Sequence, residues 1–238
     1  MPLRLHRSAA SDATAPARVG PATVLVAEQR RAFTWWVVAG LAVIVAAGGI
    51  LVHGRANPLG IEVHIVDAVD RHGGGSAFWE PVFSSAIPAT IIVVSVALLV
   101  WSLTRRWWRA VAACLAVPLA LLVAEEVFKP LVDRRDPGSG LLYPSGHLTG
   151  LGAAATLTLI LVAPRLRRPG ASIGLGIACA AVCVAGVLAA VASHAHGPID
   201  AVAGLPTGIG LTLAWVLTVD AAADASVARA SSRAAPRP

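Results

Sequence analysis

Residues 129–147 read KPLVDRRDPGSGLLYPSGH, a charged and glycine-bearing stretch that begins with Lys129 and ends with His147. A long apolar run precedes this stretch and another follows it. Lys129 is the only lysine in the chain, and it stands where the first run gives way to charged residues. The pattern therefore predicts a polar loop between two hydrophobic helices, with its charges gathered at one end of them.

The composition is that of an integral membrane protein. The chain is 56% hydrophobic and only 13% charged, which is too apolar for a soluble domain of 238 residues. A net charge of +6 would suggest a nucleic-acid partner in a soluble protein. Here the arginines lie in short clusters between apolar runs, and no basic stripe alternates with aromatic residues. We therefore exclude nucleic acid as a partner and expect membrane lipids around the chain.

Six apolar runs approach or reach the roughly 20 residues that a helix needs to cross a bilayer. They predict an all-α fold, an integral membrane six-helix bundle. A shorter stretch, residues 61–69, does not fill a span and could form a small helix on the membrane surface. The six expected spans are residues 33–52, 82–103, 108–128, 148–163, 173–192 and 201–219.

The two ends of the chain, residues 1–32 and 221–238, are rich in Ala, Arg and Pro, and we predict that both are disordered. Residues 33–220 form the membrane domain between them. Fourteen of the nineteen basic residues fall in these ends or in the loops after the second and fourth runs. Because basic residues mark the cytoplasmic side, we predict a plasma-membrane protein with both termini cytoplasmic and the loop of residues 129–147 facing outward.

The loop ends with three residues that could bind and process an anion. Ser145 and Gly146 directly precede the fourth run, so the free N–H groups of a helix beginning here would point into the outer loop. His147 could donate a proton to a leaving oxygen, because imidazole titrates near neutral pH. The alternative is that Ser145 only caps the helix and that His147 is an interfacial polar residue.

A second polar cluster, from His196 to Asp200, precedes the sixth run. The spacing of four places both side chains on one face of a helix. A carboxylate that holds one ring nitrogen leaves the other nitrogen free to attack phosphorus, as Asp orients His in hydrolases. Asp200 could instead simply cap the sixth helix.

Cations cluster around Lys129. Arg134 and Arg135 could each offer a fork of donors to a phosphate, or could pair with the aspartates beside them. Glu125 lies four residues before Lys129, so a helix-surface ion pair is the alternative for that lysine. Carboxylates near the end of an apolar span are costly unless paired or facing water, which marks this neighbourhood as functional.

The sequence predicts no metal site. His194 and His196 form a His-x-His pair, but the spacing places no third ligand. Cys114, Cys179 and Cys183 all lie in apolar runs and are expected to pack as small apolar residues.

Together, these clusters resemble three motifs of the type 2 phosphatidic acid phosphatase superfamily of lipid phosphate phosphatases. The family pattern is a lysine followed after six residues by Arg-Pro, then Pro-Ser-Gly-His, then Ser-Arg followed after five residues by His-x-x-x-Asp. The matching positions are Lys129 and Pro137 for the first motif, Pro144 to His147 for the second, and His196 with Asp200 for the third.

Two arginines of the family pattern are not matched. The arginine of the first motif falls on Asp136, with Arg135 one position early. The Ser-Arg of the third motif falls on Ala189 and Ala190. The departures leave two expectations open, a lipid phosphatase or a non-catalytic relative that binds or moves lipid phosphates.

The resemblance implies a role for each matching residue. His196 would be the nucleophile that forms a phosphohistidine, Asp200 would orient it, and His147 would protonate the leaving group. The implied substrate is a lipid phosphate such as phosphatidate or a polyprenyl diphosphate, and no metal or other cofactor is implied. The expected phosphate ligands are Lys129, Arg134, Arg135, Ser145 and the N–H of Gly146.

Overall fold

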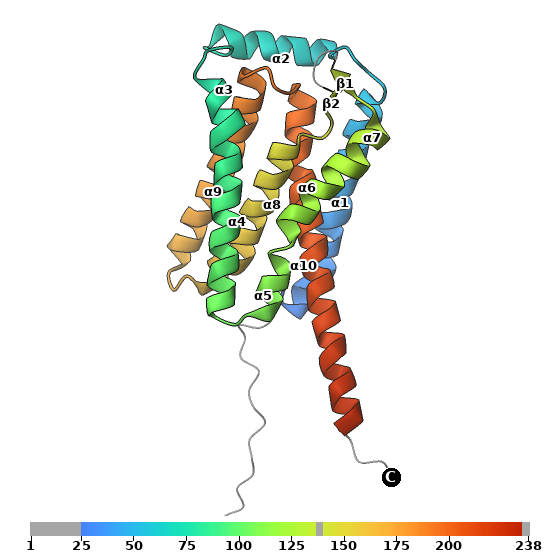
Figure 1. The fold of residues 1–238 in the computed structure, drawn as a ribbon, viewed down its shortest axis with the longest axis vertical. Coiled ribbons are helices and arrows are strands. Elements are labelled where there is room, and N and C mark those ends of the chain that lie inside the picture. The colour runs from blue at the N-terminus through green and yellow to red at the C-terminus, as the bar shows by residue number, and fades with distance from the viewer. Residues whose placement is uncertain (1–24, 137–139, 235–238) are drawn as a thin grey trace, which may run out of the picture.

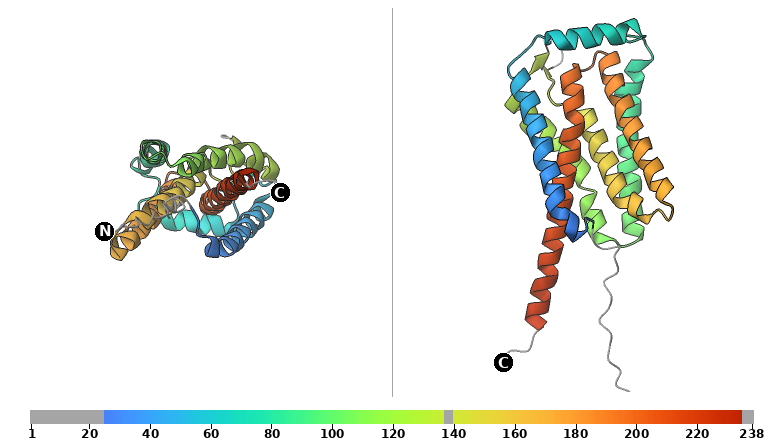
Figure 2. Two further views of the ribbon diagram at one scale, coloured as in Figure 1. Left: turned by 90° about the horizontal axis from the view of Figure 1, so that it is seen from below. Right: turned by 180° about the vertical axis from the view of Figure 1, so that it is seen from behind.

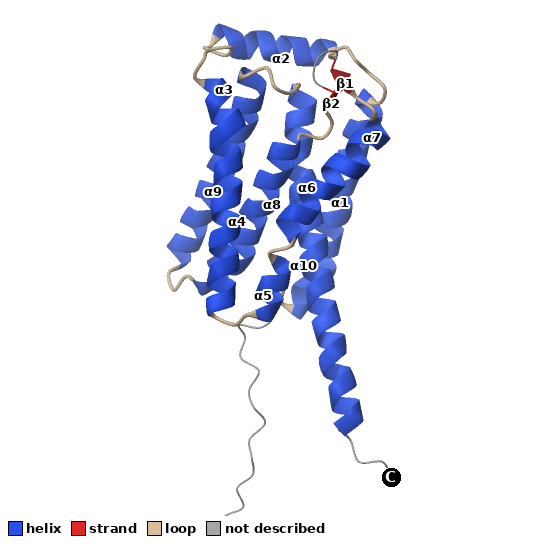
Figure 3. Ribbon diagram, viewed as in Figure 1, coloured by secondary structure: helices blue, strands red, loops and turns tan. Residues whose placement is uncertain are grey.

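The computed structural model describes residues 25–136 and 140–234, which form a bundle of helices (Figure 1, Figure 3). Within these residues, six helical segments are long and apolar enough to cross a membrane, so the predicted all-α membrane bundle is confirmed. Helices suit this setting because they pair every interior backbone group within one segment. The six spans are Glu28–Val52, Trp79–Thr104, Trp108–Val132, Gly146–Arg165, Pro169–Ala192 and Pro198–Ala230.

Several spans are built from more than one helical element. The first, fifth and sixth spans are α1 (Glu28–Val52), α9 (Pro169–Ala192) and part of α10 (Pro198–Ala234). The second joins α3 (Trp79–Pro81), the π-helical turn η2 (Val82–Ala86) and α4 (Ile87–Thr104). The third joins α5 (Trp108–Ala113), α6 (Ala116–Val123), the π-helical turn η3 (Ala124–Phe128) and α7 (Lys129–Val132). The fourth joins α8 (Gly146–Val162) and the turn η4 (Ala163–Arg165).

One end of the bundle carries the remaining elements. The short stretch predicted at residues 61–69 is the helix α2 (Gly60–Arg71), which lies across this end of the bundle (Figure 1). Next to it, strand β1 (Arg135–Asp136) pairs antiparallel with β2 (Gly140–Leu141). The beginning of α1 and the end of α10 lie at the opposite end (Figure 2).

The helix α8 lies in the middle of the bundle and packs against α4, α6, α9 and α10. Two glycines of α10 allow a close approach to α8. A Cβ on Gly204 would lie 2.7 Å from the carbonyl oxygen of Ser145, and a Cβ on Gly208 would collide with the carbonyl oxygen of Thr149. Small residues at such contacts let membrane helices pack backbone to backbone. The packing fixes the ends of α8 and α10 beside each other.

We expect Gly208→Ala to lower the stability of the bundle by about 1–3 kcal/mol, because the new methyl group forces α10 away from α8. The matched control is Gly210→Ala on the same helix. There the nearest atom to a Cβ is Leu41 Cβ at 3.5 Å, an ordinary contact, so this variant should be neutral or slightly stabilising. Thermal unfolding of both variants in the same detergent tests this difference, and equal melting temperatures would contradict it.

The two ends of the membrane domain differ from the sequence prediction. The tail predicted to be disordered from residue 221 is helical to Ala234, and the sixth span itself extends to Ala230. Its alanine-rich sequence favours helix. Asp224, in the first turn of this tail, pairs with Arg31 and Arg109. At the other end, α1 begins at Glu28, within the predicted arm of residues 1–32. Residues 1–24 and 235–238 lie outside the described residues, so the disorder predicted there stays a prediction.

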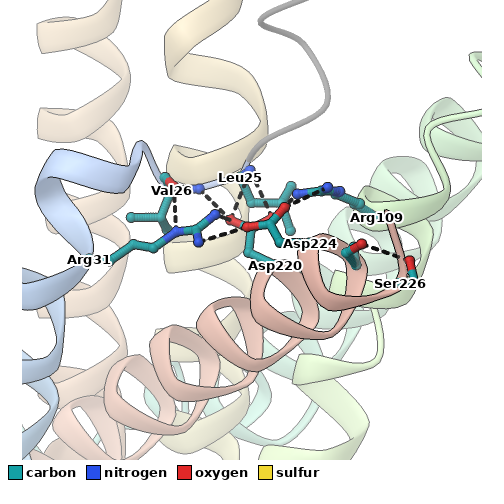
Figure 4. A network of polar contacts seen from close by, with 8 residues as sticks. Leu25, Val26, Arg31, Arg109, Asp220, Asp224 and Ser226 are labelled. Carbon is teal, nitrogen blue, oxygen red and sulfur yellow. Dashed lines mark hydrogen bonds and ion pairs between the residues drawn. The ribbon is translucent and has the colours of Figure 1, made fainter. Parts of the chain in front are cut away.

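An ionic network ties the beginning of α1 to α5 and α10 (Figure 4). Asp220 of α10 is fully buried, and its carboxylate accepts hydrogen bonds from two backbone N–H groups, with N–O distances of 2.8 Å to Val26 and 3.1 Å to Leu25. One turn later, Asp224 forms ion pairs of 2.8 Å with both Arg31 and Arg109. Two of the arginines that predicted a cytoplasmic side therefore also hold three helices together.

Candidate active site

The start of α8 and the connection between α9 and α10, which carry the polar clusters found in the sequence, lie at the end of the bundle beneath α2 (Figure 1). The amino terminus of α8 brings His147, and the loop between α9 and α10 brings His196. Both rings contact the buried ring of Phe83, with centroid distances of 4.8 Å for His147 and 5.7 Å for His196. Two histidines that are distant in sequence are thus brought to one aromatic ring.

Phe83 was not predicted from the sequence as a site residue. It lies in η2, and π-helical turns of this kind are frequent at functional sites because they widen the helix and re-aim its side chains. The third span contains a second such turn, η3, directly before Lys129. Neither π-helical turn could be predicted, because it has no clear sequence signature within an apolar run.

His196 is a buried histidine of the loop between α9 and α10. Its backbone N–H donates to the carbonyl of Ala190 at 3.2 Å, while the buried ring atom Nδ1 has no hydrogen-bond partner within the described part of the chain. Burial lowers the pKa of His196 to about 4, and the positive charges of Lys129, His147 and Arg134 add to this effect. The imidazole is therefore uncharged at neutral pH.

The protonation of His196 should make stability depend on pH. The ring has a pKa of about 4 in the folded protein and 6.5 as an ordinary histidine, so below pH 6.5 the unfolded chain binds the extra proton. Stability is thus present in full above pH 6.5 and is lost as the pH falls towards 4. Thermal unfolding at pH 7.5 and 4.5 should show a larger loss for the unmodified protein than for His196→Gln. An equal loss would contradict the lowered pKa.

Asp200 does not hold His196 in the way the spacing suggested. Asp200 is fully buried, and its Oδ1 accepts a hydrogen bond of 2.9 Å from Nη1 of Arg134. Among the residues that the structure describes, its other oxygen, Oδ2, has no hydrogen-bond partner, and neither does Nδ1 of His196. The partner of Asp200 in the free protein is therefore a guanidinium rather than the histidine.

Arg134 is buried, and the two Nη atoms of its guanidinium group donate hydrogen bonds to two different carboxylates. Besides Asp200, it donates from Nη2 to Oε2 of Glu62 at 2.8 Å. The sequence predicted a phosphate or a neighbouring aspartate as the partner of Arg134. In the structure its partners are Glu62 and Asp200. Only Arg135 pairs with a neighbour, Asp133 at 2.8 Å, and its side chain is 70% exposed.

Glu62 is a residue of the site that the sequence analysis missed. It lies in α2, is completely buried, and accepts hydrogen bonds from the N–H groups of Leu59 at 2.9 Å and Ile199 at 3.3 Å. Burial alone would raise its pKa, but the hydrogen bonds from Arg134 and Leu59 lower it below the ordinary value. In the sequence, Glu62 stands in the first turn of a short amphipathic segment. A glutamate is common there as part of a helix cap, so its position does not indicate a partner distant in the chain.

The triad of Glu62, Arg134 and Asp200 fills the space around Gly197. A Cβ at this position would lie 2.7 Å from Oε1 of Glu62, 3.1 Å from Oδ2 of Asp200 and 3.2 Å from Nη2 of Arg134. Glycine is therefore needed directly after His196. The triad ties α2 and the loop before β1 to the beginning of α10.

Ser145 does not cap its helix with its side chain. It lies at the N-cap position of α8, but its hydroxyl accepts no bond from a backbone group of the first turn. Its Oγ is buried and has no hydrogen-bond partner among the described residues, while its N–H donates to the carbonyl of Asp200 at 3.1 Å. A buried hydroxyl without a partner at a helix amino terminus is suited to bind an added group.

Lys129 lies at the start of α7, and its Nζ is 2.7 Å from Oε2 of Glu125. The ion pair predicted from the spacing of four is thus present. Glu125 also lies against Gly146, the residue before His147, so the ion pair brings Lys129 towards the amino terminus of α8.

His194 does not take the place of the missing arginine. Its Nε2 lies 3.4 Å from Oδ1 of Asp70 on α2, and its side chain is 49% exposed. The positions of the third-motif Ser-Arg hold Ala189 and Ala190, both fully buried. Among the residues that the structure describes, no group of three His, Cys, Asp or Glu side chains could hold a metal ion.

An apolar cavity of about 500 Å³ lies between α1, α7 and α10. It is lined by side chains such as Val45, Leu131 and Leu211, and includes neither histidine of the site. The described residues that line this cavity include His53 but no lysine, arginine, aspartate or glutamate.

Comparison with known proteins gives one similarity in fold. No family model matches the sequence, and no curated protein matches it. Among solved structures, the chain is similar to a transmembrane PAP2 type phosphatidylglycerolphosphate phosphatase from Bacillus subtilis, at 16% identity and a TM-score of 0.45. The similarity covers 81% of this chain and 93% of that chain.

Proposed function

We propose that this membrane protein is a phosphatase that removes phosphate from a lipid monophosphate or diphosphate through a phosphohistidine on His196. The observation that carries the proposal is the meeting of His147 and His196 at the ring of Phe83. The hydroxyl of Ser145, which has no partner among the described residues, lies at the amino terminus of the same helix, and Lys129 is linked to this terminus through Glu125.

The chemistry would take two steps. A ring nitrogen of His196 attacks phosphorus, a P–N bond forms, and the P–O bond to the lipid breaks as His147 gives its proton to the leaving oxygen. Water then attacks the phosphohistidine, His147 takes a proton from that water, and the P–N bond breaks to release inorganic phosphate and neutral His196. Lys129, Ser145 and the N–H of Gly146 would hold the phosphate oxygens as charge develops.

Asp200 would act through His196. In the free protein Oδ2 of Asp200 and Nδ1 of His196 both lack a partner. A hydrogen bond between them in the substrate complex would satisfy both atoms and fix the tautomer of the ring. Arg134, which holds the other oxygen of Asp200, would then be a positioning residue rather than a phosphate ligand.

We also propose that the site faces outward and that both termini are cytoplasmic. The site lies at the end of the bundle beneath α2, and the described ends of the chain lie at the other end (Figure 1). The excess of arginines at that other end supports a cytoplasmic location for it.

A second function is favoured by the charges of the site. Arg134 is committed to two carboxylates, and alanines stand at positions 189 and 190. A site with few free cations would suit a protein that binds or moves lipid phosphates without cleaving them. The two functions differ in whether phosphate is released.

Phosphate release by the detergent-purified full chain, with a chelator present, distinguishes them. The panel is phosphatidate, lysophosphatidate and a polyprenyl diphosphate. We expect release from at least one lipid. Folded protein that binds these lipids but releases no phosphate would support the binding function and overturn the phosphatase.

A further inference from the structure

The carboxylate of Glu125 lies where the phosphate is expected. Its Oε2 is 2.7 Å from Nζ of Lys129. Its Oε1 lies against Gly146, the first residue of α8, so closely that a Cβ on Gly146 would collide with it. The carboxylate is thus placed between a lysine and a helix amino terminus, the two features that attract an anion.

We propose that Glu125 is an internal competitor for the phosphate, and that the substrate must displace its carboxylate from Lys129 and the amino terminus of α8. The inference rests on the proposed function for the identity of the site. It adds that the carboxylate of Glu125 blocks the site until an anion displaces it.

A simple ion pair on a helix surface does not account for this placement. An i,i+4 pair needs only one carboxylate oxygen at the lysine, yet the second oxygen of Glu125 lies against the buried Gly146 of another span. The π-helical turn η3, which contains Glu125, widens the helix at this point. Gly146 leaves room for the carboxylate, because any larger residue would exclude it.

The charges of the site make displacement necessary. The side chains of Lys129 and Arg134 supply two positive charges, while Glu125, Glu62 and Asp200 supply three carboxylates. A phosphate that entered beside Glu125 would meet a site without excess positive charge. If Glu125 swings out, Lys129 becomes free for the phosphate.

Glu125 can leave at little cost. Its side chain is 44% exposed, and the ion pair of an exposed carboxylate contributes little to stability. After the reaction its return would compete with inorganic phosphate for Lys129. The same residue would therefore weaken substrate binding and promote product release.

The test is binding of inorganic phosphate and orthovanadate to the detergent-purified full chain, measured by calorimetry, so it does not depend on turnover. Glu125→Gln removes the competing charge and should bind both anions at least about fivefold more tightly than the unmodified protein. The matched control is Glu126→Gln, since Glu126 is the exposed neighbour in the same turn. This control should bind like the unmodified protein.

Other outcomes would overturn the inference. Equal or weaker binding by Glu125→Gln would show that the carboxylate does not compete, and an equal gain by Glu126→Gln would show only a general effect of charge. Lys129→Gln tests whether phosphate binds at the proposed site at all, separately from the role of Glu125. If phosphate binds but is insensitive to this change, or binds to no variant, the proposed phosphate site is wrong as well.

Discussion

Arg134→Met should cost the protein about 3–5 kcal/mol of stability, because it removes one partner of a buried ionic network. Arg134 lies between Glu62 and Asp200, both completely buried, at 2.8 Å and 2.9 Å. Without the guanidinium, two carboxylates would remain buried close together with no cation between them. Such charges must be hydrated or protonated, and either route loosens the contact between α2 and the bundle.

The neighbouring residue provides the control. Arg135 is 70% exposed and pairs with the exposed Asp133, so Arg135→Met should change stability by no more than about 0.5 kcal/mol. Thermal unfolding of both variants in one detergent, at neutral pH, measures the difference. Similar melting temperatures for the two variants would mean that the triad does not hold the site together.

His196→Ala should reduce phosphate release by at least about a thousandfold, because it removes the nucleophile and leaves only binding groups. The matched control is His194→Ala, which changes the other histidine of the same loop. His194 is half-exposed and turned to Asp70 on α2, so its loss should leave the rate within a few-fold. Equal losses in the two variants would point to damage to the loop rather than to a role in the reaction.

Much of the fold followed from the sequence because the membrane limits what an apolar run can do. Each run long enough to cross the bilayer became a span, and the short stretch at residues 61–69 became α2. The Pro-Ser-Gly-His segment and the segment from His196 to Asp200 could be placed at one end, since each directly precedes a span. The structure then brought both histidines to Phe83.

The rest depended on contacts between residues distant in sequence. Nothing near Glu62 indicates that it meets Arg134 and Asp200, because the register of α2 over the bundle is set by tertiary packing. The same applies to Asp220 and Asp224, whose arginine partners lie on α1 and α5. These contacts also explain why α10 continues as a helix where composition alone predicted disorder.

The most direct test of the central proposal is to trap the covalent intermediate. The purified protein is mixed with lipid substrate carrying labelled phosphate and quenched within a turnover. Protein-bound label is then examined for the acid lability and alkali stability of a phosphoramidate. We predict label on the peptide containing His196 and none on His196→Ala. Phosphate release without labelled protein, or labelling that survives His196→Ala, would contradict the proposed mechanism.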